Sequence, residues 1–129
     1  MKALLALLTF AFASSLALSA DEPAKDAPVK IEQAEKLIAD GVQLLDVRTQ
    51  EEWDEGHLKG AKMVTVTEKD FLKKAKATLD PKKPVLVYCR SGGRSAKAVK
   101  QLREAGFTTV HDMDGGITAW EKAGKPVEK

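Results

Sequence analysis

The chain of 129 residues has few cysteines and histidines, namely one cysteine, Cys89, and two histidines, His57 and His111. A single cysteine cannot form a disulfide within the chain. Three such residues spread this widely do not match the closely spaced Cys and His patterns of zinc sites. The sequence therefore predicts neither a metal site nor another cofactor, and it leaves a single thiol whose purpose has to be explained.

The chain also lacks a marked excess of either charge. It has 21 basic and 19 acidic residues, a formal net charge of +2, and its lysines are spread along the chain rather than gathered in one run. This near-balance gives no electrostatic reason for binding nucleic acid or an anionic membrane. We therefore expect no nucleic-acid partner.

Long apolar runs are absent except at the N-terminus, where Lys2 precedes a mostly apolar stretch over residues 3–18. A positive start, a short apolar stretch and small residues after it predict a secretory signal peptide over residues 1–20, cleaved near Ser19 or Ala20. The stretch is shorter than the roughly 20 residues that span a bilayer, although an uncleaved anchor is the alternative. We expect a periplasmic or secreted protein that has no membrane attachment after cleavage.

The rest of the chain reads as a flexible leader over residues 21–28 and one domain over residues 29–129, in which strands alternate with helices. The predicted strands cover residues 29–31, 42–47, 61–66, 84–88 and 108–113, and helices are predicted within 31–41, 49–57, 67–79, 95–105 and 117–124. This alternation indicates an α/β domain with a mainly parallel sheet.

The single cysteine lies in the stretch YCRSGGRS, residues 88–95, between a predicted strand and a predicted helix. In open α/β sheets, ligands bind beyond the carboxyl ends of the strands, where free N–H groups and the helix start attract anions. Gly92 and Gly93 allow the backbone to curl, so that successive N–H groups can point inward. The stretch is therefore predicted to form an anion-binding loop.

Polar side chains complete this loop, because Arg90 and Arg94 add positive charge and Ser91 and Ser95 add hydroxyl groups. These surroundings should lower the pKa of the thiol, so Cys89 is predicted to be a nucleophilic thiolate that faces an anionic substrate. A lone cysteine can also be a small buried apolar residue, but its place among these residues favours a reactive thiol.

Three segments together resemble a single-domain rhodanese, a family of sulfurtransferases. They are LLDVRTQEEWDEGHLKGA (44–61), VLVYCRSGGRS (85–95) and GFTTVHDMDGGITAWEKAGKPV (106–127). The resemblance implies a rhodanese-like fold with a five-stranded, mainly parallel sheet flanked by helices. It also implies that Cys89 takes the outer sulfur of thiosulfate or a similar donor as a persulfide. A thiophilic acceptor, cyanide in the usual assay, then removes that sulfur.

The same resemblance implies roles for the residues around Cys89. Asp46 would support the loop, and Arg48 would pair with an acidic residue such as Glu52, while His57 falls in a structural turn. The loop itself would bind the substrate: its N–H groups would hold the persulfide sulfur, and its arginines would hold the oxyanion of the donor. The loop residues are Arg90, Ser91, Gly92, Gly93, Arg94 and Ser95. The segment GAKMVT (60–65) departs from the more apolar family pattern, which leaves the physiological substrate open.

Other functions are compatible with a cysteine loop. A persulfide carrier would hand its sulfur to a protein partner, and a non-catalytic rhodanese-like domain often lacks the cysteine, which this chain keeps. Tyrosine phosphatases use a longer loop, with arginine six positions after the cysteine, where this chain has Ser95. Here the arginine is Arg94, five positions after Cys89, so the anion-binding loop is shorter and smaller than in a phosphatase. We therefore expect a monomeric thiosulfate sulfurtransferase whose partners are a small anionic sulfur donor and a thiophilic acceptor.

Overall fold

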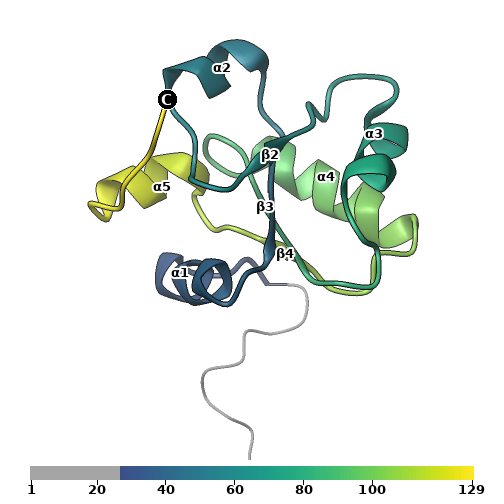
Figure 1. The fold of residues 1–129 in the computed structure, drawn as a ribbon, viewed down its shortest axis with the longest axis horizontal. Helices are drawn as coiled ribbons and strands as arrows, with labels where there is room; N and C mark the ends of the chain where they lie inside the picture. The colour runs from purple at the N-terminus through teal and green to yellow at the C-terminus, as the bar shows by residue number, and fades with distance from the viewer. Residues whose placement is uncertain (1–26) are drawn as a thin grey trace, which may run out of the picture.

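The computed structural model describes residues 27–129, in which a central sheet has helices on both sides (Figure 1). The predicted signal peptide over residues 1–20, and all but the last two residues of the predicted leader, lie outside the described residues. Among residues 27–129, no helix is long and apolar enough to cross a membrane.

The sheet has four parallel strands in the order β2-β1-β3-β4. They are β1 (Gln43–Asp46), β2 (Lys62–Met63), β3 (Val85–Tyr88) and β4 (Val110–Asp112). Every residue of β3 is buried, because this central strand is covered on both faces, as its continuous apolar sequence predicts. Since all the strands run in one direction, their carboxyl ends meet at a single edge of the sheet.

The prediction of five strands is wrong by one. Val29 pairs with Met113 through a single parallel bridge, and the first helix begins only two residues later, at Ile31. Ile31 belongs to the apolar side of that helix, so too little extended chain remains before it to form a strand. The α/β class with a parallel, helix-flanked sheet is confirmed.

Within residues 27–129, one helix precedes the strands and four others connect or follow them: α1 (Ile31–Ala39), α2 (Gln50–Glu55), α3 (Phe71–Thr78), α4 (Gly93–Glu104) and α5 (Gly116–Lys122). Helix α2 begins with a capping box, because the Glu52 N–H donates to Thr49 Oγ1 at 3.3 Å and the Thr49 N–H donates to Glu52 Oε1 at 3.5 Å. This cap places α2 directly after the end of β1.

The two faces of the sheet carry separate hydrophobic clusters. One cluster lies against α3 and α4 and includes Val87 and Cys89, whereas the other lies against α1 and α5 and includes Leu86 and Tyr88. Leu86 and Val87 are 0% exposed, and each such burial stabilises the fold by about 1.5–3 kcal/mol. Because successive residues of a strand face opposite sides, Tyr88 packs toward α5 and the next residue, Cys89, packs toward α4.

Candidate active site

The thiol of Cys89 lies at the carboxyl end of β3, inside the loop that leads into α4. Its side chain is buried, with the residue only 1% exposed. The Gly92 N–H donates to the Cys89 Sγ at 3.0 Å, and Gly92 adopts a φ of +128° that favours glycine. The loop therefore curls around the sulfur, which is the arrangement that its two glycines predict.

Ser95, on the first turn of α4, provides the second contact to the sulfur. The Cys89 thiol donates to Ser95 Oγ at 3.4 Å, and the Ser95 hydroxyl donates to the Gly92 carbonyl at 3.1 Å. Ser95 is 0% exposed, so these contacts are shielded from water. When Cys89 loses its proton, the Ser95 hydroxyl can turn and donate to the sulfur instead, because a hydroxyl both donates and accepts.

The pKa of Cys89 lies below its ordinary value as the outcome of two opposing effects. Burial disfavours the charged thiolate and acts to raise the pKa, but hydrogen bonds outweigh it. The donors are the Ser95 side chain and the N–H groups of Ser95, Gly92 and Ser91. The loop thus favours the thiolate, the form of cysteine that acts as a nucleophile.

Arg94 does not point its charge freely toward a ligand, because it forms a two-pronged ion pair with Glu52 of α2. The Arg94 Nη1 and Nη2 atoms lie 2.6 and 2.9 Å from the two Glu52 carboxylate oxygens. The hydrogen bond from Arg94 is the main reason why the pKa of Glu52 falls from 4.5 to about 2. Arg94 therefore ties the start of α4 to α2.

Glu52 was the expected partner of Arg48, but the structure pairs Arg48 with Asp46 instead. Arg48 Nη2 lies 2.8 Å from Asp46 Oδ2 and donates to the Gly56 carbonyl at 2.7 Å. Both Asp46 and Arg48 are buried, at 0% and 4% exposure. The reason is local: a single residue separates Asp46 from Arg48, whereas the carboxylate of Glu52 is bound by Arg94.

Tyr88 completes this buried group beneath the loop. The Arg48 guanidinium carbon lies 5.7 Å from the centroid of the Tyr88 ring, a cation–π distance. The Tyr88 hydroxyl accepts a hydrogen bond from the Leu58 N–H at 3.1 Å. Burial is the main reason why the pKa of Tyr88 lies far above its usual range. Asp46 is in register with Tyr88 across the sheet, so this ion pair braces the strand end that precedes Cys89.

The start of α5 holds the backbone of the loop from the other side. The Ile117 N–H donates to the Cys89 carbonyl at 2.9 Å, and the Thr118 N–H donates to the Arg90 carbonyl at 3.1 Å. Gly116 makes this approach possible, because a Cβ atom there would lie 2.6 Å from the Arg90 carbonyl oxygen. The sequence did not predict this contact with the cysteine, although the DGG motif at 114–116 lies in a segment that resembles the family.

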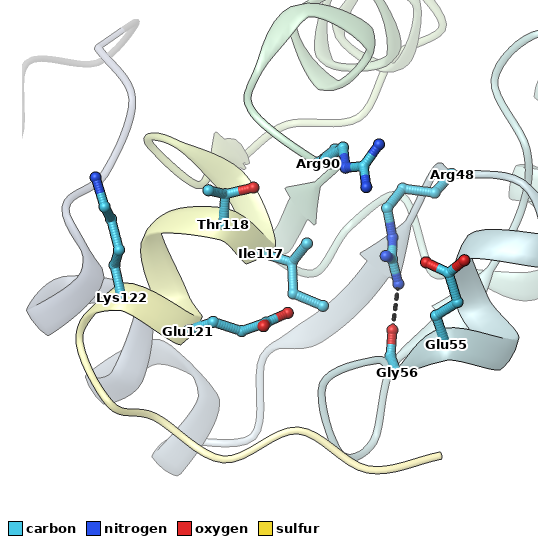
Figure 2. Close-up of a pocket in the computed structure, with 8 residues that line it drawn as sticks. All are labelled: Arg48, Glu55, Gly56, Arg90, Ile117, Thr118, Glu121 and Lys122. Carbon is cyan, nitrogen blue, oxygen red and sulfur yellow. Dashed lines mark hydrogen bonds between the residues drawn. The ribbon is translucent and has the colours of Figure 1, made fainter.

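A pocket of about 570 Å³ opens beside the loop (Figure 2). It is lined by Arg48, Glu55, Gly56, Arg90, Ile117, Thr118, Glu121 and Lys122. Of the residues singled out from the sequence, only Arg48 and Arg90 line it. Glu55 and Glu121 were missed, because charged residues on a helix usually indicate nothing more than a solvated surface.

The remaining loop residues have simpler surroundings. Ser91 and Gly93 are exposed, and Gly93 is the first residue of α4. Within the described part of the chain, no three His, Cys, Asp or Glu side chains gather closely enough to hold a metal ion. What the geometry offers is a buried thiol with a lowered pKa, N–H donors around it and a charged pocket next to it.

A parallel α/β sheet with a buried thiol in the loop after a central strand defines the class of protein, and comparisons with known proteins identify the family. The sequence model of the rhodanese-like domain matches residues 30–123. The chain therefore belongs to the rhodanese-like domain family.

Named relatives and solved structures agree with this assignment. Thiosulfate sulfurtransferase 16, chloroplastic, from Arabidopsis thaliana is 37% identical over 118 residues, which cover 84% of this chain and 98% of the relative. Thiosulfate sulfurtransferase 18 from the same plant is 37% identical over 77% of this chain and 81% of its own length. The rhodanese-like domain of an Anabaena protein, solved by NMR, superposes with a TM-score of 0.70 at 28% identity, covering 78% of this chain and 77% of that domain. Together these likenesses support sulfurtransferase activity in general.

Proposed function

We propose that this protein is a thiosulfate sulfurtransferase that carries sulfur as a persulfide on Cys89. The observation that carries the proposal is the position of the Cys89 sulfur, 3.0 Å from the Gly92 N–H and held in a loop that lowers its pKa. Family membership and the names of the relatives support the choice of reaction.

In the first half-reaction, the Cys89 thiolate attacks the outer sulfur of thiosulfate or a similar donor. The sulfur–sulfur bond of the donor breaks, sulfite leaves with the bonding electron pair, and a persulfide remains on Cys89. Inward-pointing N–H groups of the loop would stabilise the negative terminal sulfur. Arg90 is the cation for the donor oxyanion, because it has no ion pair among the described residues, whereas Arg94 is held by Glu52 and positions the loop.

In the second half-reaction, a thiophilic acceptor attacks the terminal sulfur of the persulfide. The bond to the Cys89 sulfur breaks, its electron pair returns to Cys89, and the thiolate is restored. With cyanide as the acceptor in vitro, the product is thiocyanate. An anionic acceptor needs no proton transfer in this step. The lowered pKa of Cys89 also helps, because it makes the thiolate a better leaving group.

The test is the intact mass of the protein after thiosulfate treatment, with and without cyanide, beside a Cys89→Ser variant. We expect wild type to gain one sulfur atom, cyanide to remove it, and the variant to gain none. A stable gain that cyanide cannot remove would replace the proposal with a persulfide carrier. No gain at all would overturn sulfur transfer from thiosulfate, and hydrolysis of an aryl phosphate would then be assayed.

We further propose that the protein is exported and acts in the periplasm or outside the cell. The support is the sequence of residues 1–20, with its positive start, short apolar stretch and small residues before the cut. N-terminal sequencing of the protein from fractionated cells tests this. A start at Ala20 or Asp21 in the exported fraction is expected, and a protein that keeps Met1 in the cell interior would contradict it.

A further inference from the structure

Asp112, the last residue of β4, has a buried carboxylate oxygen that makes no hydrogen bond. Its Oδ1 atom is shielded from water and has no hydrogen-bond partner among residues 27–129. Buried polar atoms in proteins are nearly always paired, because another partner has to replace the water that they lose on folding. The unpaired oxygen of Asp112 therefore has to be explained by the groups that lie next to it.

Asp112 lies on the same face of the sheet as Cys89. Strand β4 is the edge strand beside β3, and Asp112 is in register with Val87, two residues before Cys89 (Figure 1). Val87, Cys89 and Val110 all belong to the hydrophobic cluster against α3 and α4. Because residues two apart on a strand share a face, Asp112 extends to the same side as Val110. Its carboxyl group thus lies on the side of α4, the helix that begins beside the sulfur.

Ser95 of α4 connects the carboxyl group of Asp112 with the thiol of Cys89. The Ser95 side chain lies within hydrogen-bonding reach of the Asp112 carboxyl, and its Oγ accepts from the Cys89 thiol at 3.4 Å. The Ser95 hydroxyl itself donates to the Gly92 carbonyl at 3.1 Å. This hydroxyl has a single hydrogen. A thiolate at Cys89 therefore has to compete for that hydrogen with the Gly92 carbonyl and the Asp112 carboxyl.

The charged groups around Asp112 are few. Burial is the main reason why the pKa of Asp112 lies above its ordinary value. Asp114, in the following turn, raises this pKa further, whereas Arg103 of α4 acts to lower it. On the side of the sulfur, Arg94 interacts with the charge of Cys89. Asp112 thus reaches the sulfur through a neutral hydroxyl, and its own charge is costly to keep in the fold.

We propose that Asp112 is a positioning residue that acts on Cys89 through Ser95, because its carboxylate competes with the sulfur for the Ser95 hydroxyl. A carboxylate is a stronger acceptor than a carbonyl, so ionised Asp112 draws the hydrogen away from the sulfur. The Ser95 oxygen then accepts from the thiol, which stabilises the protonated form of Cys89. Asp112 thereby opposes the N–H groups of the loop, which favour the thiolate.

The consequence for catalysis rests on the proposed function. A cysteine that ionises less readily has a smaller share of thiolate at neutral pH, but each thiolate is a stronger nucleophile. Asp112 would therefore set the balance between these two quantities for the attack on the sulfur donor. The ionisation of Cys89 itself does not depend on the substrate, so alkylation measures it separately from sulfur transfer.

The first test is the rate of Cys89 alkylation by iodoacetamide from pH 5 to pH 10, in wild type and in Asp112→Asn. The amide keeps the shape of the carboxylate without its charge, so it competes for the Ser95 hydroxyl no better than a carbonyl does. We expect the profile to move to lower pH and the rate on its rising part to increase by about threefold. An unchanged or slower rate in Asp112→Asn would overturn the proposal.

A double variant tests whether the effect passes through Ser95. Ser95→Ala leaves no hydroxyl to compete for, so adding Asp112→Asn should leave the alkylation profile where Ser95→Ala alone places it. A threefold increase that persists in the Ser95→Ala background would overturn this route, because the charge of Asp112 would then act directly on the sulfur.

Asp114→Asn is the matched control, because it removes an exposed carboxylate two residues further along the chain. Its alkylation profile should match that of wild type. A shift as large as that of Asp112→Asn would overturn the proposal, because any negative charge near the end of β4 would then have the same effect.

Urea denaturation at pH 7 separates an effect on the thiol from a loss of structure. Folding raises the pKa of Asp112, so the stability that this carboxyl group contributes is present at low pH and is lost as pH rises through the raised pKa. At pH 7 Asp112→Asn should therefore be at least as stable as wild type. Faster alkylation in a less stable variant would overturn the proposal, because local unfolding would then expose the thiol.

Sulfur uptake from thiosulfate, followed by intact mass, distinguishes this inference from the proposed function. If the alkylation results are as expected but wild type gains no sulfur, the proposed function fails and the competition for the Ser95 hydroxyl stands. If sulfur is gained, the pH profile of its uptake should move to lower pH in Asp112→Asn, together with that of alkylation. An uptake profile that stays in place while alkylation moves would overturn the role of Asp112 in the reaction.

Discussion

The two sides of the Cys89–Arg90 backbone differ in how their polar groups are satisfied. On the loop side, the Cys89 sulfur has the Gly92 N–H and Ser95 Oγ as partners, and Arg94 is paired with Glu52. On the pocket side, Arg90 makes no ion pair within the described residues, although it lies four positions before Arg94.

The difference reflects what each side has to hold. A reacting sulfur atom has one position, so donors fixed in advance stabilise it without reorganising during the reaction. A pocket for an exchangeable ligand has to leave charges available, because charges already paired within the protein would have to be separated first. The polar groups of the loop are therefore already paired within the protein, whereas Arg90 in the pocket wall remains available to a ligand. The following experiments disturb one side at a time.

The largest effect is expected from Gly116→Ala, which pushes α5 away from the loop. The added Cβ would lie 2.6 Å from the Arg90 carbonyl oxygen, and residue 116 has a φ of +59°. We expect the free energy of unfolding to fall by about 3 kcal/mol, from the left-handed backbone and the overpacking together. Urea denaturation measures it, and alkylation of Cys89 reports the damage to the loop.

Gly41→Ala is the matched control, because Gly41 has a φ of +85° but nothing within 4 Å of an added Cβ. It should lower the free energy of unfolding by only about 1–2 kcal/mol, the penalty of the backbone conformation. Equal losses in the two variants would show that the contact between α5 and the loop contributes nothing.

The next effect concerns the loop side alone. Ser95→Ala removes the hydroxyl that helps to lower the pKa of Cys89, so that pKa should rise and less thiolate should be present at pH 7. Because the lost hydrogen bond stabilised a charged group, we expect alkylation of Cys89 by iodoacetamide at pH 7 to be about tenfold slower in the variant. The rate is measured from pH 5 to pH 10, and the whole profile should move to higher pH.

Ser91→Ala is the control for this experiment. Ser91 is exposed, and the group that it offers to the sulfur is its backbone N–H, which alanine keeps. Its alkylation profile should match that of wild type. If Ser95→Ala also matched wild type, the hydroxyl would have no part in ionising Cys89.

The third experiment compares the unpaired and the paired arginine. Arg90→Ala should raise KM for thiosulfate by about fivefold, with a smaller change in kcat, because an exposed cation attracts the dianion mainly on binding. Arg94→Ala should instead lower kcat, because it releases the start of α4 from Glu52. Steady-state kinetics with cyanide separate the two. A KM effect confined to Arg94→Ala would reverse the assignment.

The smallest effect is expected from Glu52→Gln. The pKa of Glu52 is lowered from 4.5 to about 2, so its stabilising effect is present above pH 4.5 and is lost as pH falls toward 2. At pH 7 the variant should be less stable than wild type by up to about 1 kcal/mol, since the pair is partly exposed. Thermal unfolding measured between pH 7 and pH 3 should show the two proteins converge as pH falls, and a constant difference would contradict the role of this charge.

Much of the fold was predictable because its signals are local. The continuous apolar run of β3, the Thr49–Glu52 capping box and the glycines around Cys89 act within a few residues. The strand predicted at 29–31 failed because an extended pattern of three residues competes with a helix that begins at Ile31. Short apolar segments next to a helix start do not reveal which structure takes them.

By itself, the sequence determined that the chain forms a parallel α/β domain with one thiol in a glycine-containing loop, because strand and helix periodicity and glycine conformation are properties of neighbouring residues. Only the tertiary structure decided that Arg94 pairs with Glu52, 42 residues away, and that Glu55 and Glu121 face one pocket from two helices. Such contacts join distant parts of the chain, so local preferences do not determine them. The packing of α2 and α5 against the loop decides which charges pair and which remain available to a ligand.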